Sequence, residues 1–343
     1  MDAKSNEKPA PSSARGPRRK PVVIDFHAHF MTQEVFDATY KLSVLGKLRA
    51  SAENTGAVRS FPDALIQPMT DLGVRLRAMD KMGVDIQVVS PNILHQCTYA
   101  LDAEEGLRLE RLNNDHVADM VAKAPDRLIG IGSVPLQDTA SAIAEMDRLV
   151  GDLKLKGVIV ASRVNDMELG DARLRPFWKK AEALDIPVFV HPAGNPDPRL
   201  QRHSMLISLG QPLEEAFAQT SLIYDGVLDE CPNLKIAFAH GGGFIPYYAG
   251  RFDWMYRRGS TSQMKADFST YLRSFYYETV LFNPDILEHL AEKVDASHIM
   301  LGSDFPFGEA DPVAFLQSAR QISEASREAI LGANAARFLA IKI

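Results

Sequence analysis

Eight short apolar runs, separated by segments long enough for helices, constrain the fold of this 343-residue chain more than any other feature. Most runs are continuous rather than alternating, which is typical of strands buried on both faces of a parallel sheet. Strand and helix alternating eight times predict an α/β fold of the (β/α)8 TIM barrel type. The runs span residues 22–30, 84–90, 128–135, 157–162, 187–192, 234–240, 275–280 and 298–305.

The connection between the first and second runs is too long for a single helix. It covers residues 31–83, and only its last part, around 72–82, has the pattern of the expected helix. Long connections in compact domains usually have a function. We therefore predict a small insertion at about residues 31–70, forming a subdomain or a lid over the barrel mouth. The connection 193–232 is a second candidate cover.

Residues 1–21 differ in composition from the remainder. They contain four prolines and a basic cluster in the motif RGPRRK. Such a segment buries little apolar surface, so we predict a disordered N-terminal tail, followed by one barrel domain at residues 22–343. A targeting or nucleic-acid role for the basic cluster is the alternative. Asp2, Glu7 and the prolines argue against an amphipathic transit helix.

Composition limits the kinds of binding partner and the cellular compartment that we expect. The chain has a net charge of −6 and 46% hydrophobic residues, and its apolar runs are too short to span a bilayer. We expect neither a nucleic acid nor a membrane as partner. The two cysteines, Cys97 and Cys231, form neither a disulfide framework nor a CxxC metal site. A reducing compartment, the cytoplasm, is the prediction.

Histidines and an aspartate gather at the ends of the predicted strands. His27 and His29 end the first run, His191 the fifth, His240 the sixth, and Asp304 lies in the eighth. In a (β/α)8 barrel the chemistry lies at this rim. Because side chains alternate along a strand, the two histidines of HxH point the same way. Two such imidazoles, a third imidazole and a carboxylate suit one divalent metal ion, Zn²⁺ first and Mn²⁺ as the alternative.

Each of these residues also has a simpler interpretation. A single buried histidine is usually a hydrogen-bonded core residue, and Asp304 is also a candidate helix N-cap. HxH, HP, HGGG and SDxPF in this order, each closing a different predicted strand, favour a metal site. The fourth run carries no lysine at its end, and the nearest, Lys156, lies at the opposite end. This argues against a second metal bridged by a modified lysine.

Several longer motifs resemble one known family. They are DFHAHF, VPLQD, DIPVFVHP, FAHGGGFIPYYAGR, FNP and LGSDFPFGE. They resemble the amidohydrolase superfamily, and within it the family of α-amino-β-carboxymuconate-ε-semialdehyde decarboxylase in the amidohydrolase 2 group. The resemblance runs from Val22 to the C-terminus. It implies a distorted (β/α)8 barrel with a small insertion after the first strand, and a homodimer.

The resemblance also implies roles for individual residues. It makes His27, His29, His191 and Asp304 the ligands of one divalent metal, with His240 as the acid or base beside a metal-bound water. Asp304 then has a catalytic as well as a ligand role. Three further residues are expected to bind the substrate, a small carboxylate. They are Arg251, reaching a neighbouring subunit's site, Arg59 in the insertion, and Phe307 in the pocket wall.

The implied reaction is non-oxidative decarboxylation of a carboxylated muconate semialdehyde or a hydroxylated aromatic acid. The sequence HPAGNP lacks the tryptophan that follows the HP pair in the family's type member, which leaves the substrate open. The intact HxH pair favours the semialdehyde branch. Alternatives are a hydrolase of lactones or amides, with Asp304 as proton shuttle, a hydratase, and a barrel that binds metal without catalysis.

Overall fold

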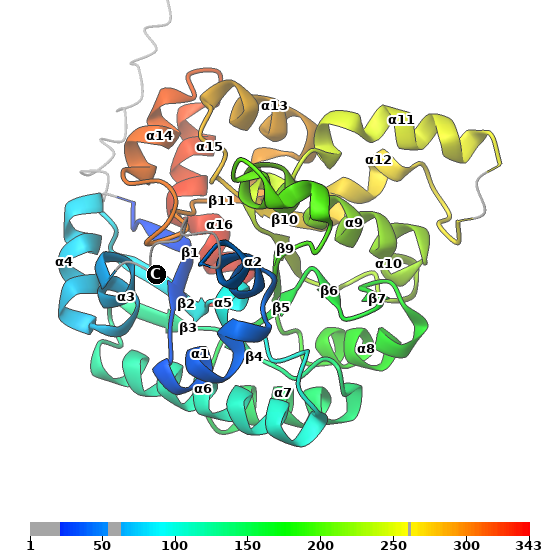
Figure 1. Ribbon diagram of the computed structural model, residues 1–343. Coiled ribbons are helices and arrows are strands. Elements are labelled where there is room, and N and C mark those ends of the chain that lie inside the picture. The colour runs from blue at the N-terminus through cyan, green and yellow to red at the C-terminus, as the bar shows by residue number, and fades with distance from the viewer. Residues whose placement is uncertain (1–20, 54–62, 260–261) are drawn as a thin grey trace, which may run out of the picture.

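The computed structural model describes residues 21–53, 63–259 and 262–343 (Figure 1). The predicted tail, apart from Pro21, lies outside the described residues, and so does Arg59. Strands run through the centre and helices surround them, as the alternation of apolar runs and helix-length segments predicts.

Each of the eight predicted runs contains strand. Parallel pairing links β1, β2 and β3 in one group and β11, β10, β9, β8, β5 and β4 in another. The strands are β1 (Ile24–Phe30), β2 (Ile86–Pro91), β3 (Leu128–Gly130), β4 (Gly132–Ser133), β5 (Val158–Ala161), β8 (Val188–His191), β9 (Ile236–Phe238), β10 (Phe275–Glu278) and β11 (Ile299–Met300). A short antiparallel pair, β6 (Arg163–Val164) and β7 (Met167–Glu168), follows β5.

Backbone hydrogen bonds join these two groups into a closed barrel. The amide of Ile131, between β3 and β4, donates to the carbonyl of Val89 in β2 at 3.0 Å. On the other side, the Phe26 amide donates to the Leu301 carbonyl at 2.8 Å, and Ala28 pairs with Phe305 in a parallel bridge. The first and last strands therefore meet at one seam, and the predicted (β/α)8 barrel is confirmed.

The helices pack around this barrel. They are α1 (Gln33–Thr39), α2 (Val44–Glu53), α3 (Asp63–Thr70), α4 (Leu72–Met82), α5 (Ile93–Gln96), α6 (Ala103–Lys123), α7 (Thr139–Gly151), α8 (Arg175–Ala183), α9 (Gln211–Tyr224), α10 (Val227–Glu230), α11 (Ile245–Arg257), α12 (Phe268–Tyr271), α13 (Pro284–Val294), α14 (Pro312–Ser318), α15 (Glu324–Glu328) and α16 (Asn334–Phe338). No helix of the described ranges is both long and apolar enough to cross a membrane.

Local sequence signals account for several helix ends. Helix α4 begins after Asp71, whose carboxylate accepts a hydrogen bond from the Val74 amide at 2.9 Å. It ends at Gly83, which has a φ of 71°. These signals place α4 at the predicted residues 72–82. Helix α6 begins in the same way, after Asp102.

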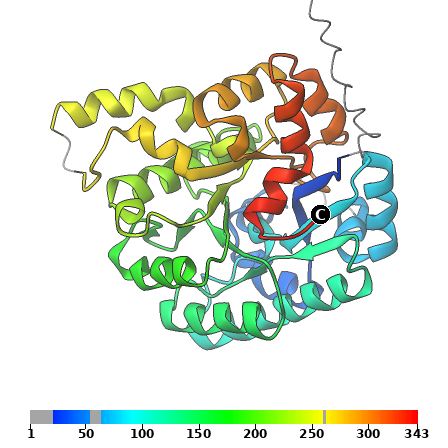
Figure 2. The ribbon, with the colours of Figure 1, turned by 180° about the vertical axis from the view of Figure 1, so that it is seen from behind.

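Aromatic side chains in the core pack the first strand against the last helix. The ring of Phe26 in β1 lies 5.0 Å from that of Phe189 in β8 and 5.5 Å from that of Phe338 in α16. The view from behind shows α16 and the chain's end beside β1 (Figure 2). This packing fixes β1, which carries the HxH pair.

Two connections lie near the barrel mouth. The predicted insertion contains α1, α2 and α3, and α2 lies in front of the strands in Figure 1. The long connection after β8 contains a π-helical turn, η4 (Leu206–Gly210), that leads into α9. Leu45 of α2, Leu65 of α3 and Ile207 of η4 all line the cavity that is described below.

Candidate active site

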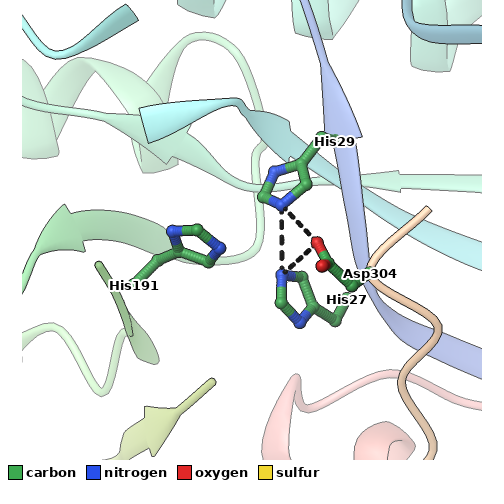
Figure 3. Close-up of side chains that lie close together, drawn as sticks. All are labelled: His27, His29, His191 and Asp304. Atoms are coloured by element: carbon green, nitrogen blue, oxygen red, sulfur yellow. Dashed lines mark hydrogen bonds and ion pairs between the residues drawn. The ribbon is translucent and has the colours of Figure 1, made fainter. Parts of the chain in front are cut away.

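Four side chains converge at the carboxyl ends of the barrel strands. His27 and His29 come from β1, His191 ends β8, and Asp304 follows β11. One ligand atom of each lies within 4.8 Å of the others. In Figure 3, His27, His29 and Asp304 form a triangle, and His191 lies across from them. The structure thus brings together the four residues that the sequence motifs single out.

The closest contacts in this cluster involve the ligand atoms themselves. His27 Nε2 lies 3.1 Å from His29 Nε2, and Asp304 Oδ1 lies 2.9 Å from His29 Nε2 and 3.3 Å from His27 Nε2. The side chains of His27, His29 and His191 are at most 2% exposed. Burying three imidazoles and a carboxylate so close together is costly unless a cation or protons balance them.

The Nδ1 atoms of two of these histidines, on the ring side away from the cluster, have hydrogen-bond partners. His27 Nδ1 lies 3.2 Å from Glu278 Oε1, and His191 Nδ1 lies 2.8 Å from the Pro192 carbonyl oxygen. A carbonyl oxygen only accepts, so His191 donates its Nδ1–H and keeps a lone pair on Nε2. Metal-binding histidines are usually oriented in this way. The donor set, nitrogen and oxygen atoms facing one point, fits a divalent metal ion.

Electrostatics favour the protonation states of ligands. Burial raises the pKa of Asp304, but the neighbouring charge of His27, the proximity of His240 and a hydrogen bond with His29 hold it well below its usual value. Burial, followed by the charges of His29 and His27, puts the pKa of His191 well below its usual value. An ionised carboxylate and a neutral imidazole are the forms that bind a metal.

His240 lies beside this cluster, between two carboxylates. It follows β9 in the turn η5 (His240–Gly242) and has a positive φ of 48°, which is uncommon outside glycine. Its Nδ1 lies 2.6 Å from Glu215 Oε1, and its Nε2 lies 3.8 Å from Asp304 Oδ2. Burial by itself lowers the pKa of His240, but the charge of Glu215, the proximity of Asp304 and the hydrogen bond with Glu215 raise it well above its usual value.

The glycine run after His240 allows this turn to approach α9. Gly241, Gly242 and Gly243 have φ values of 61°, 75° and 66°. A Cβ on Gly243 would lie 2.3 Å from the Pro212 carbonyl oxygen. Only glycine fits here, because both the conformation and the space exclude a side chain. The glycine run therefore permits a close backbone approach between the turn after β9 and α9.

A cavity of ≈ 800 Å³ opens above the cluster. His29, His191, His240 and Asp304 form part of its lining. Most of the other walls are apolar, and they include Leu45, Leu65, Leu94, Ile207, Phe244, Val280, Leu281, Phe282 and Phe307. Among the described residues, the lining contains neither lysine nor arginine. The cavity therefore suits a small, largely apolar molecule that presents a polar group to the cluster.

The structure places the remaining predicted residues differently. Phe307 lines the cavity, its ring 5.9 Å from that of His29. Arg251 lies on α11, exposed, and is not among the residues that line the cavity. Within the described ranges Arg251 forms no ion pair, and the neighbouring Asp253 accepts a hydrogen bond from the Ser269 amide. Arg59 falls outside the described residues.

Sequence reasoning missed two carboxylates that contact the site, Glu215 and Glu278. Both side chains are fully buried. Glu278 ends β10, at the same rim as the histidines, so the rule used for those residues could have found it. Glu215 lies inside α9, and its position carries no comparable signal.

Comparisons with known proteins agree with the fold and the motifs. The profile of the amidohydrolase family matches residues 24–341. The 2-amino-3-carboxymuconate-6-semialdehyde decarboxylase of Dictyostelium discoideum is 33% identical over 279 residues, which cover 79% of this chain and 77% of that protein.

Two solved structures extend the comparison to three dimensions. The 5-carboxyvanillate decarboxylase of Sphingomonas paucimobilis superposes with a TM-score of 0.85 and 28% identity, covering 94% of this chain and 100% of that one. A second structure is a dihydroxybenzoic acid decarboxylase from Polaromonas sp. JS666 with bound manganese and the inhibitor 2-nitroresorcinol. It superposes with a TM-score of 0.80 and 27% identity, covering 94% of this chain and 97% of that one. The chain therefore belongs to the amidohydrolase family, in the branch that includes these decarboxylases.

Proposed function

We propose that this protein is a metal-dependent carboxy-lyase that removes CO2 from a small carboxylated substrate without oxidation. The observation that carries the proposal is the cluster of His27, His29, His191 and Asp304 beside His240, at the base of an apolar cavity. The named activities of the relatives support the same reaction.

The proposed metal ligands are His27, His29, His191 and Asp304. When bound, a divalent ion supplies a Lewis acid that polarises a substrate oxygen and acidifies a coordinated water. Zn²⁺ suits the three imidazoles and one carboxylate. Mn²⁺ is the alternative, supported by the manganese in the Polaromonas structure.

His240 is the proposed proton donor. In its protonated form it gives a proton to the carbon that carries the carboxylate, and the bond to the carboxylate then breaks. The bonding electrons restore the double bond, CO2 leaves as a neutral molecule, and His240 regains a proton from solvent. Glu215 balances the imidazolium charge from the side away from the cluster, at 2.6 Å. The ionised Asp304 keeps the Nε2 side of the ring oriented towards the substrate.

The cavity walls favour one branch of the substrate class. Apolar side chains pack well against an aromatic ring, and they weaken the solvation of the carboxylate, which favours its release as CO2. We therefore place a hydroxylated aromatic acid first and a carboxylated muconate semialdehyde second, with Phe307 against the ring. The sequence motifs alone favour the reverse order.

We also propose a homodimer in which Arg251 binds the substrate carboxylate in the partner's cavity. Its exposure on α11 supports this role, and large apolar side chains surround it. Tyr247, Tyr248, Trp254 and Met255 on the same helix are 46–65% exposed, a pattern that is common at interfaces. Arg59 stays a proposed second carboxylate ligand. The cytoplasmic location and the lack of nucleic-acid and membrane partners stay predictions.

Elemental analysis of the purified protein and of the His27→Ala/His29→Ala double variant is the first experiment. We expect about one divalent ion per chain, lost in the double variant. The wild type is then screened with hydroxybenzoates and carboxylated muconate semialdehydes for CO2 release. Ring opening or water addition in place of CO2 would favour the hydrolase or hydratase alternative. A protein that takes up no metal on reconstitution would contradict the mechanism.

The subunit arrangement needs its own test. Arg251→Ala and His240→Ala chains, each of which we expect to be inactive alone, are mixed and re-associated. If Arg251 acts across the interface, part of the mixed dimers regain one intact site. Mixed dimers without activity would contradict the arrangement.

A further inference from the structure

Strand β1 is irregular where it carries the HxH pair. Its pairing with β2 passes from Asp25 opposite Gln87 to Ala28 opposite Val89. Phe26 and His27 therefore face a single residue of β2, as in a β-bulge. Bulges re-aim side chains and leave backbone groups without strand partners, and they are frequent beside active sites. The amide of His27 finds a partner in the Asp25 carboxylate, with Oδ1 at 3.2 Å.

Asp25 is fully buried and accepts hydrogen bonds from three residues. Besides the His27 amide, Oδ1 accepts from the Ser303 amide at 2.9 Å. Oδ2 accepts from the Ser303 hydroxyl at 2.5 Å and from the Gln87 side-chain amide at 2.8 Å. One carboxylate thus links the start of β1, strand β2 and the segment after β11. It does so at the seam where the barrel closes.

Ser303 carries this link to Asp304. Asp304 has a φ of 55°, in the left-handed region that only a few per cent of non-glycine residues adopt. The Ser303 amide and hydroxyl donate to Asp25, while the same hydroxyl accepts from the Phe305 amide at 3.2 Å. Asp304 is therefore held on both sides by hydrogen bonds that involve Ser303.

Arg75 brings the second histidine into the same network. It lies on α4, and its guanidinium is fully buried, which is rare for arginine. Nη1 donates to Gln87 Oε1 at 2.7 Å, and Nη2 donates to the backbone carbonyl of His29. Gln87 in turn donates to Asp25, so a continuous chain of hydrogen bonds runs from α4 to the segment after β11.

We propose that Arg75, Gln87, Asp25 and Ser303, here called the seam network, are positioning residues that hold the backbone of His27, His29 and Asp304 in ligand geometry. None of the four side chains belongs to the proposed ligand set. Arg75 and Asp25 bond the backbone of His29 and of His27. Gln87 joins these two side chains, and Ser303, bonded to Asp25, directly precedes Asp304. The network rests on the metal site proposed above. Because it fixes three ligands in advance, it should raise the affinity for the metal and not only the stability of the barrel.

The chain offers a matched control for this idea. The Ser133 hydroxyl also donates to a buried carboxylate, that of Glu110, and the Ser133 amide is bound by Asn114. Ser303→Ala and Ser133→Ala therefore remove the same kind of bond from two different places in the barrel. Asp25→Asn is a second change in the network that keeps the shape of the side chain. Circular dichroism shows whether each variant is folded.

The experiment measures the affinity of the metal-free proteins for Zn²⁺ and Mn²⁺ by competition with a chromophoric chelator, together with melting temperatures in the absence of metal. We expect Ser303→Ala to bind metal at least tenfold more weakly than wild type, in the range typical of residues that orient ligands. Asp25→Asn should also weaken metal binding. Ser133→Ala should lower the melting temperature by a similar amount and leave metal affinity unchanged.

Wild-type affinity in both Ser303→Ala and Asp25→Asn would overturn the proposal, and so would an equal loss in Ser133→Ala. The metal titration needs no substrate, so this result is independent of the reaction. A wild-type protein that binds metal but releases no CO2 would refute the proposed decarboxylation and leave the seam network standing. A wild-type protein that binds no metal would refute both.

Discussion

Glu215 Oε1 lies 2.6 Å from His240 Nδ1, a contact that joins helix α9 to the turn after β9. Glu215 is fully buried, which raises the pKa of its carboxyl to about 7, and the neighbouring His240 acts in the opposite direction by stabilising the ionised form. The contact fixes the ring so that its Nε2 faces Asp304 and the cavity. The position of the proposed proton donor therefore depends on a residue outside the cavity lining.

Glu215→Gln removes the negative charge beside His240 and keeps the shape of the side chain. The amide keeps a hydrogen-bond acceptor near Nδ1, but it no longer stabilises a protonated ring. We expect kcat for CO2 release to fall about 10²–10⁴-fold, with metal content unchanged. Steady-state kinetics and elemental analysis measure both. Glu110→Gln, which also replaces a buried carboxylate, should keep wild-type kcat, and an equal loss there would contradict the specific role of Glu215.

Gly302→Ala should displace Glu278, a carboxylate that contacts His27. An added Cβ would lie 2.5 Å from Glu278 Oε2, the carboxylate that contacts His27 through its other oxygen. We expect a loss of about 1–3 kcal/mol in the free energy of unfolding, because the core has no space for the methyl group. Urea denaturation measures it.

Gly151→Ala is the matched control. At Gly151, the last residue of α7, an added Cβ meets no heavy atom within 4 Å. This variant should gain up to about 1 kcal/mol, since alanine loses less backbone entropy on folding. Equal effects of the two substitutions would show that the crowding at Gly302 has no consequence.

Glu110 should make stability depend on pH. Burial raises the pKa of this carboxyl to about 7, although hydrogen bonds from Ser133 and Thr98 act in the opposite direction. The folded protein thus binds the proton more tightly than the unfolded chain. The resulting stabilisation is complete below the unfolded pKa of about 4.3 and is lost as pH rises towards 7.

Glu110→Gln removes this titration. Between pH 5 and pH 8, the free energy of unfolding of the wild type should fall by about 2–3 kcal/mol relative to that of the variant. Urea unfolding of both proteins across this range measures the difference. Parallel pH profiles would contradict the raised pKa.

Metal removal should lower the melting temperature. A metal that binds the folded state alone stabilises it by about 2.7 kcal/mol when free metal is a hundredfold above Kd. We expect this stabilisation to disappear on adding a chelator, because His27, His29, His191 and Asp304 then lose their common partner. The His27→Ala/His29→Ala variant should melt at the same temperature with and without chelator. A chelator effect of equal size in this variant would place the stabilising metal elsewhere.

The barrel and its rim could be predicted because both leave local signals. Each strand of the barrel coincides with an apolar run, although the short pair β6 and β7 does not. His27, His29, His191 and Asp304 each follow from the rule that chemistry lies where barrel strands end. The ends of α4 are encoded by Asp71 and Gly83, which act on neighbouring residues. Such short-range signals can be read without knowing the fold.

The supporting residues could not be found in this way. Arg75 is a charged residue in an amphipathic helix, a pattern that usually indicates solvent exposure, yet its guanidinium is buried against β1. Glu215 contacts His240 25 positions later only because α9 packs on the end of β9. Asp25 receives donors from Ser303, 278 positions away. Tertiary packing alone creates these contacts.

The seam between β1 and β11 determines when, during synthesis of the chain, the site can form. Asp304 contacts His29 across 275 positions of the 343-residue chain, so both histidines are synthesised long before the carboxylate. A ribosome-bound chain that ends before residue 299 holds HxH and His191 but neither β11 nor the aspartate. The proposed four-residue metal site is complete only when the last strand has closed the barrel, so we expect tight metal binding to mark a fully folded chain.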